Sequence, residues 1–198
     1  MNKIFLTVMV SFFAAGALYA NGPAAAPKAA AQFKKYSMDR GYFSCLIPAG
    51  WTLEREKERD AAYGIFEIQL IAPGPQKAPV SVFVSYYSKH NDDFDGHADF
   101  IDRNSTNALG ETRSDTENYE PVKKIKLGAR KGFELAREKT AFLHPESKSD
   151  ESVQLKEKTY VLPARQGFYV LHFSAPSGTF AENLPVFEKI AGSFKGKF

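Results

Sequence analysis

Cysteine is scarce in this sequence: there is one among 198 residues. Cys45 has no second cysteine to pair with, so an intramolecular disulfide is excluded and stability must come from a hydrophobic core. Paired Cys-x-x-Cys motifs and the haem attachment motif are excluded for the same reason. Because Cys45 alternates with Phe43 and Ile47, we expect a small buried hydrophobic residue, and a disulfide between two chains is the alternative.

The sequence also lacks a large excess of positive or negative charge. The chain has 26 Lys and Arg against 23 Asp and Glu, a formal net charge of +3. A nucleic-acid-binding protein needs a concentrated basic footprint, so no nucleic acid is expected as a partner. The sequence also lacks a Gly-x-Ser-x-Gly elbow, a phosphate loop and a dinucleotide fingerprint. We therefore predict no catalytic residues, and an enzyme of unrecognised type is the alternative.

Only one long apolar run is present, at the start of the chain. Lys3 precedes the apolar run 4–18, and small Ala20 precedes polar Asn21. This run is shorter than the roughly 20 residues that a membrane span needs, and its order of parts is typical of a secretory signal. We predict that residues 1–20 are a signal peptide cleaved after Ala20, leaving a periplasmic or secreted protein that is not an integral membrane protein. An uncleaved N-terminal anchor is the alternative.

Aromatic residues are abundant, with 17 Phe and 9 Tyr. They bury large areas and allow one domain of this size to fold without covalent cross-links. Residues 21–39 are rich in Ala, Pro and Lys, which predicts a flexible leader. Residues 40–198 are predicted to form a single domain.

Short aromatic and β-branched runs separated by Pro and Gly predict strands from Tyr42 onward. Phe66, Ile68 and Leu70 share one face of a two-residue period, with Glu67 on the other. Strands are predicted over 43–47, 51–56, 66–72, 80–87, 122–127, 130–138, 153–163 and 167–175. The last of these carries bulky residues on both faces, so we expect it to be central and covered on both sides.

Two helices are predicted among these strands. The first follows Phe94, has apolar residues at helical spacing from Ala98 to Ala108, and ends at a Gly110 cap. The second carries an apolar stripe from Val186 to Phe194. Strands in succession with inserted helices predict the α+β class, an antiparallel β-sheet sandwiched between helices.

Six segments occur in an order that resembles the PsbP-like family, the Mog/PsbP type of α/β/α sandwich. The resemblance covers residues 41–198 and suggests a bacterial periplasmic member. It implies an antiparallel sheet between helices and a non-enzymatic accessory role, such as helping a larger complex to assemble or to retain ions. That role belongs to the photosynthetic members, and no functional motif of theirs is matched here. The segments are 43–51, 80–84, 99–101, 127–133, 167–171 and 187–194.

The acidic stretch 91–102 is the candidate metal site. Its oxygen-bearing residues and one glycine occupy positions 1, 3, 5, 6, 9 and 12 of a calcium loop. Asn at the first position and Asp at the twelfth depart from the usual pattern. The alternatives are that Asp93 or Asp95 caps the following helix, or that His90 and His97 add to a transition-metal site of unfamiliar spacing. The candidate calcium ligands are Asn91, Asp93, Asp95, Asp99 and Asp102.

One local excess of positive charge stands out between residues 123 and 131, where five basic residues occur without an acid. Strand alternation predicts Lys124 and Lys126 on one face and Lys123 on the other. A solvated sheet edge protected by lysines is one interpretation. The other is a docking patch for an acidic partner or for anionic lipid headgroups. The residues are Lys123, Lys124, Lys126, Arg130 and Lys131.

These patterns favour a non-catalytic periplasmic accessory or binding protein that acts through protein–protein contacts with an unknown envelope protein or complex. A divalent-metal-binding protein using residues 91–102 is the second hypothesis. Of the remaining histidines, His144 lies in a polar loop, and His172 is expected to be hydrogen-bonded and partly buried rather than a general base.

Overall fold

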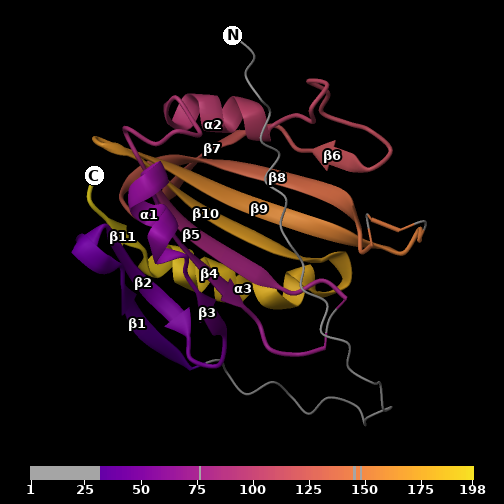
Figure 1. The fold of residues 1–198 in the computed structure, drawn as a ribbon, viewed down its shortest axis with the longest axis horizontal. Helices are drawn as coiled ribbons and strands as arrows, with labels where there is room; N and C mark the ends of the chain where they lie inside the picture. The colour runs from indigo at the N-terminus through magenta and orange to yellow at the C-terminus, as the bar shows by residue number, and fades with distance from the viewer. Residues whose placement is uncertain (1–31, 76, 145, 148) are drawn as a thin grey trace. The chain divides into compact units, whose positions relative to one another are not determined.

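The main sheet of the fold has eight strands, all antiparallel to their neighbours. We describe it from a computed structural model that covers residues 32–75, 77–144, 146–147 and 149–198, apart from the side chains of residues 58, 59 and 61. The strands are β3 (Thr52–Glu54), β4 (Ile65–Ile71), β5 (Ser81–Ser88), β6 (Glu117–Tyr119), β7 (Lys123–Leu127), β8 (Arg130–Phe142), β9 (Ser152–Ala164) and β10 (Gly167–Pro176). Their order is β3-β4-β5-β10-β9-β8-β6, and β7 pairs with β8 (Figure 1).

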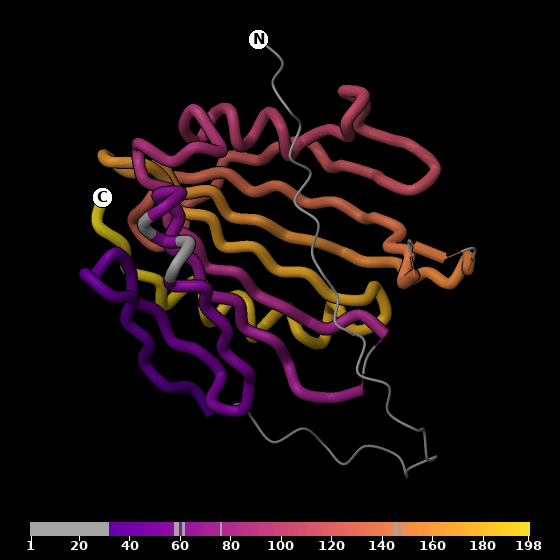
Figure 2. Tube along the Cα trace, viewed as in Figure 1, coloured from indigo at the N-terminus to yellow at the C-terminus, as the bar shows by residue number. Residues whose placement is uncertain are grey.

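A second, small sheet joins the two ends of the described chain. It has the order β1-β2-β11, formed by β1 (Phe33–Ser37), β2 (Phe43–Pro48) and β11 (Lys195–Gly196). Figure 2 shows the yellow C-terminal segment beside the indigo N-terminal strands. The leader predicted over 21–39 is therefore wrong at its C-terminal end, because pairing with β2 makes residues 33–37 a strand. The predicted signal, 1–20, lies outside the described residues.

The described residues form three α-helices beside the sheets: α1 (Lys57–Tyr63), α2 (Gly96–Asn104) and α3 (Ser177–Ser193). Helix α3 lies across one face of the main sheet, and α2 lies near β7 and β8 (Figure 1). Helix α2 ends earlier than predicted, and Gly110 (φ +79°) lies in a separate turn where its N–H donates to the Asn107 carbonyl at 2.9 Å. No helix in the described part of the chain is long and apolar enough to cross a membrane.

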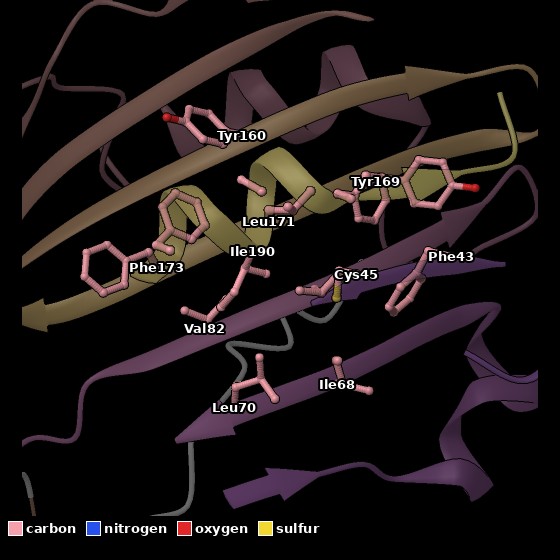
Figure 3. Close-up of a cluster of buried hydrophobic side chains, with 14 of the residues drawn as sticks. Phe43, Cys45, Ile68, Leu70, Val82, Tyr160, Tyr169, Leu171, Phe173 and Ile190 are labelled. Atoms are coloured by element: carbon pink, nitrogen blue, oxygen red, sulfur yellow. The ribbon is translucent and has the colours of Figure 1, made fainter. Parts of the chain in front are cut away.

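The larger core lies between α3, β2 and one face of the main sheet. Ile68 and Leu70 of β4 are fully buried there, as are Leu171 and Phe173 of β10. Figure 3 shows the Ile190 side chain of α3 among these sheet residues. Burial of each such side chain contributes about 1.5–3 kcal/mol to folding. This core confirms the prediction that Ile68 and Leu70 share one face of the sheet, and it shows that α3 covers that face.

A smaller core lies on the opposite face, under α2. Phe100 of α2 packs with Phe168 and Val170 of β10 and with Val161 of β9. The Tyr87 ring stacks on Phe168 with a centroid distance of 4.8 Å. Strand β10 lies between β5 and β9 and buries residues on both faces, which confirms that it is central and covered on both sides.

Cys45 is 3% exposed and unpaired in the larger core. Burial raises the pKa of its thiol to about 12, so it stays protonated at physiological pH. The prediction of a small buried hydrophobic residue is confirmed.

The elements that the sequence did not predict are short and polar. Helix α1 has seven residues, and Arg55 just before it donates a hydrogen bond from Nε to the Asp60 carboxylate at 3.2 Å. The same guanidinium bonds Asp39 at 2.8 Å, which links α1 to the 3₁₀ turn at Asp39–Gly41. These contacts are polar, and the one to Asp39 joins residues 16 positions apart, so a local hydrophobic period could not indicate them.

Candidate partner-binding site

The β7–β8 hairpin carries all five basic residues of the predicted patch. Strand β7 pairs with β8 alone, so its outer edge has no strand partner within the described residues. The turn between the strands uses Gly128 at φ +60°, a conformation that glycine adopts at little cost. The register places Lys126 opposite Lys131, Leu127 opposite Arg130, and Lys123 opposite Glu134.

The two faces of this hairpin differ in their surroundings. Lys124 is opposite Phe133, whose ring stacks on His97 of α2 with a centroid distance of 6.0 Å. Ile125 and Leu127 instead pack against the larger core on the α3 side. The predicted alternation is thus present, with Lys124 and Lys126 together on one face and Lys123 on the other.

On the α3 side, the positive charge of Lys123 is neutralised. Its Nζ lies 2.7 Å from the Glu120 carboxylate and 4.0 Å from that of Glu134. The hydrogen bond and the charge of Glu120 raise the pKa of Lys123. Lys158 of β9 lies 3.3 Å from Glu134 and 3.3 Å from Glu188 of α3. Each lysine here therefore has a carboxylate partner.

On the α2 side, three exposed lysines have no carboxylate partner among the residues that the structure describes. They are Lys124, Lys126 and Lys131, which we call the docking face. Lys126 and Lys131 are directly opposite each other across the ladder, and like charges in that position are destabilising. The hairpin thus keeps an unfavourable charge pair on this side.

Arg130 is separated from the docking face. It lies on the α3 side, and its guanidinium carbon is 3.1 Å from the centroid of the Phe198 ring. A pocket of about 320 Å³ lies beside it, between the hairpin turn and the C-terminal end of α3. The five predicted residues therefore lie on two faces of the hairpin rather than in one patch.

Asn91, the first residue of the acidic stretch, uses its side chain for hydrogen bonds within the loop. The Asn91 side chain accepts a hydrogen bond from the Phe94 N–H at 2.8 Å and donates to the Ser88 carbonyl at 2.8 Å. It also donates to the Phe94 carbonyl at 3.1 Å. The amide of Asn91 is thus used to close the loop that leads into α2.

Asp99 is the carboxylate that caps α2. Its Oδ2 accepts from the Asp95 N–H at 3.0 Å and lies 3.4 Å from Nη1 of Arg103. Asp95 holds the N-cap position, but its side chain makes no capping hydrogen bond. The capping interpretation is therefore corrected: Asp99, in the first turn, replaces Asp93 or Asp95. Within the described ranges, no three His, Cys, Asp or Glu side chains are grouped so that they could hold a metal ion. Asp102, the last of the candidate calcium ligands, therefore belongs to no such group.

A charged cluster on the same side of the sheet was not predicted. The side chain of Glu157 is only 4% exposed, is paired with Arg137, and lies 2.8 Å from Lys139 Nζ. Burial alone would raise the pKa of Glu157, but the positive charges of His172, Arg137 and Lys139 lower it to about 2. The available signal was that Glu157 shares its face of β9, by the two-residue period, with apolar Leu155 and Val161.

His172 lies beside this cluster on β10. Its Nδ1 is 2.8 Å from Thr159 Oγ1, and the residue is partly buried. Burial lowers the pKa of His172 in spite of nearby Glu157. The prediction of a hydrogen-bonded, partly buried histidine is confirmed.

No family model matches the sequence, and no curated protein sequence matches it either. The fold matches the solution structure of cyanobacterial PsbP (CyanoP) from Synechocystis sp. PCC 6803. The TM-score is 0.50 at 14% identity, over 88% of this chain and 98% of that one. The chain has a PsbP-like fold.

Two further solved structures are similar to this chain. A crystal structure from Bacteroides thetaiotaomicron VPI-5482 gives a TM-score of 0.51 at 11% identity, over 83% of this chain and 48% of that one. The Ran-binding protein Mog1p of Saccharomyces cerevisiae gives 0.48 at 10% identity, over 84% and 96%. The PsbP-like resemblance drawn from the sequence is confirmed for the fold, while at such identities the likeness establishes no function.

Proposed function

We propose that this chain is a non-catalytic binding protein that docks an acidic partner protein on its docking face, Lys124, Lys126 and Lys131. The observation that carries the proposal is the exposed cross-strand pair of Lys126 and Lys131, which has no carboxylate partner in the described chain. Such a pair costs stability in the free protein. An acidic partner would supply the missing counter-charges and accelerate association.

The PsbP-like fold supports an accessory role, because the resemblance of the sequence to that family implies one. The proposal includes export: residues 1–20 act as a signal cleaved after Ala20, and one domain beginning at β1 works in the periplasm or outside the cell. The partner is then an envelope protein or complex. Protein recovered from the periplasmic fraction should have a mass that corresponds to a chain starting at Asn21, and a full-length mass would refute cleavage.

The docking face is tested by charge removal with a matched control. The variant Lys124→Gln/Lys126→Gln/Lys131→Gln should lose cross-linking to the envelope partner of the wild type. The control Lys34→Gln/Lys35→Gln/Lys89→Gln removes equal charge from exposed lysines on β1 and after β5, and it should retain the same cross-link. Equal capture by both variants would refute the docking face.

Two purified probes separate the alternatives for this surface. A glutamate-rich peptide should bind the wild type, and its affinity should fall as salt rises from about 0.05 to 0.2 M, because exposed charges are screened. Vesicles containing phosphatidylglycerol are the second probe. Binding to vesicles without binding to the peptide would mean that the surface recognises lipid, and the proposal of an acidic protein partner would be wrong. If these lysines only protect the exposed sheet edge from aggregation, neither probe should bind the wild type, and the variant Lys124→Gln/Lys126→Gln/Lys131→Gln should aggregate.

A further inference from the structure

The pocket beside Arg130 is built from three separate parts of the fold. The β7–β8 turn supplies Leu127 and Arg130, and β9 supplies Leu162. The C-terminal end of α3 and the residue after it supply Ala191, Gly192 and Phe194. Its volume of about 320 Å³ is at the lower end of the range for small-molecule sites.

The buried side chains that line the pocket are apolar and firmly held. Leu162 is fully buried, and Ala191 and Phe194 are 1% and 9% exposed. The segment after α3 is fixed because the Tyr169 hydroxyl accepts a hydrogen bond from the Lys197 N–H at 2.8 Å and donates one to the Tyr42 carbonyl at 2.9 Å. A ligand would therefore meet preformed apolar surface, which lowers the ordering cost of binding.

Among the residues that the structure describes, Arg130 is the only charged one that lines this pocket. Its guanidinium rests on the Phe198 ring, and it has no hydrogen bond or ion pair with any residue in the described part of the chain. Stacking limits the motion of the guanidinium while leaving its N–H donors free. The planar guanidinium can donate two parallel hydrogen bonds to the two oxygens of a carboxylate, and it matches a monatomic anion less well.

We propose that this pocket binds a small monocarboxylic acid whose organic part is apolar. The carboxylate pairs with the Arg130 guanidinium, and the apolar part lies against Leu162 and Phe194. Within the described ranges, no acidic side chain lines the pocket to oppose the anion. The site is on the α3 side of the hairpin, so it is separate from the docking face and does not depend on it.

Octanoate is a suitable probe, and octan-1-ol is its neutral counterpart. We expect saturable octanoate binding with a Kd of about 1 mM or tighter. In the full mature protein, the amide NMR shifts that change should be those of the hairpin turn and of residues 191–194. No saturation up to about 10 mM, or equal affinity for octan-1-ol, would refute a carboxylate site.

Two pairs of variants give the test its specificity. Arg130→Gln should weaken octanoate binding at least about tenfold because a charge-assisted bidentate pair is lost. Lys131→Gln removes the same charge from the next residue, on the docking face, and should change octanoate affinity less than about twofold. Equal effects of the two variants would show that only net charge matters, and the site would be wrong.

The second pair consists of one variant at the pocket and a control at the other end of α3, both chosen to leave the helix intact. Gly192 lines the pocket, and a Cβ added there meets no atom within 4 Å, so we expect a Gly192→Leu side chain to fit beside the pocket and to abolish octanoate binding. Gly178→Leu at the other end of α3 also has free space, and it should leave binding unchanged. Both variants exchange glycine for a better helix former, so retained melting temperatures confirm folding. Octanoate binding by Gly192→Leu at the wild-type affinity would place the ligand elsewhere.

Discussion

The two faces of the main sheet differ in the chemistry of their side chains. The face toward α3 is filled with large apolar side chains from β4, β5, β10, α3 and β2. The face toward α2 has a small aromatic core near one end and buried polar groups beyond it, including Glu157 and Thr159. The difference shows that one face supplies most of the hydrophobic stability. The other carries Lys124, Lys126 and Lys131, which have no carboxylate partner in the described part of the chain.

The largest expected effect separates the two cores. Phe187→Ala removes a fully buried ring from the larger core and should cost about 4–5 kcal/mol of unfolding free energy. Phe100→Ala, in the smaller core at 7% exposure, should cost about 3 kcal/mol because that site is closer to solvent and can relax. Urea denaturation of both variants measures the difference. A larger loss for Phe100→Ala would reverse the ranking of the two faces.

The next effect concerns the buried charge on the α2 side. The pKa of Glu157 is about 2 in the folded protein and about 4.5 when unperturbed. A lowered carboxyl pKa stabilises the fold above the unfolded value, and this stabilisation is lost as pH falls through the folded value. We therefore expect about 3 kcal/mol to disappear between about pH 5 and pH 2.

Glu157→Gln is the matched variant for this pH dependence. It leaves Arg137 and Lys139 without their carboxylate and should cost about 3 kcal/mol at pH 7. Its unfolding free energy should then vary less than that of the wild type between pH 5 and pH 2. Parallel pH profiles for the two proteins would mean that Glu157 is not the titrating group.

A smaller effect tests the cap of α2. Asp99→Ala removes the acceptor for the Asp95 N–H and should cost about 1 kcal/mol. Asp95→Ala removes a side chain that makes no capping bond and should cost less than half of that. Thermal melts at several millimolar Ca²⁺, with EDTA as reference, also test the calcium-loop interpretation. A calcium-dependent rise in melting temperature that Asp99→Ala abolishes would support it over capping alone.

The smallest effect compares the two sides of the hairpin. Lys126→Gln relieves repulsion with Lys131 and should raise the unfolding free energy by about 0.3 kcal/mol at low salt. Lys123→Gln loses the Glu120 partner and should lower it. Opposite signs for two nearby lysines would confirm that Lys126 carries unpaired charge and Lys123 does not, whereas equal signs would show that the two lysines do not differ.

Much of the fold could be predicted because hydrophobic period is local. The alternation of Phe66, Ile68 and Leu70 indicated both the strand and its buried face, and bulk on both faces of β10 indicated its central place. Strand β1 could not be predicted, since Lys34 and Lys35 interrupt its pattern and only pairing with β2 defines it. The site was predicted in part: the five basic residues were found, but their division between two faces and a pocket was not.

The sequence by itself determined which residues of each strand point the same way, because side chains alternate with a period of two whatever surrounds the strand. It therefore placed Lys124 with Lys126 and apart from Lys123. Only the tertiary structure decided which charges found partners. Glu120 and Glu134 reach Lys123, while Lys131 faces Lys126 and the Phe198 ring supports Arg130. Ion pairing and stacking depend on distances of a few ångströms between separate segments, and those distances are set when the chain packs.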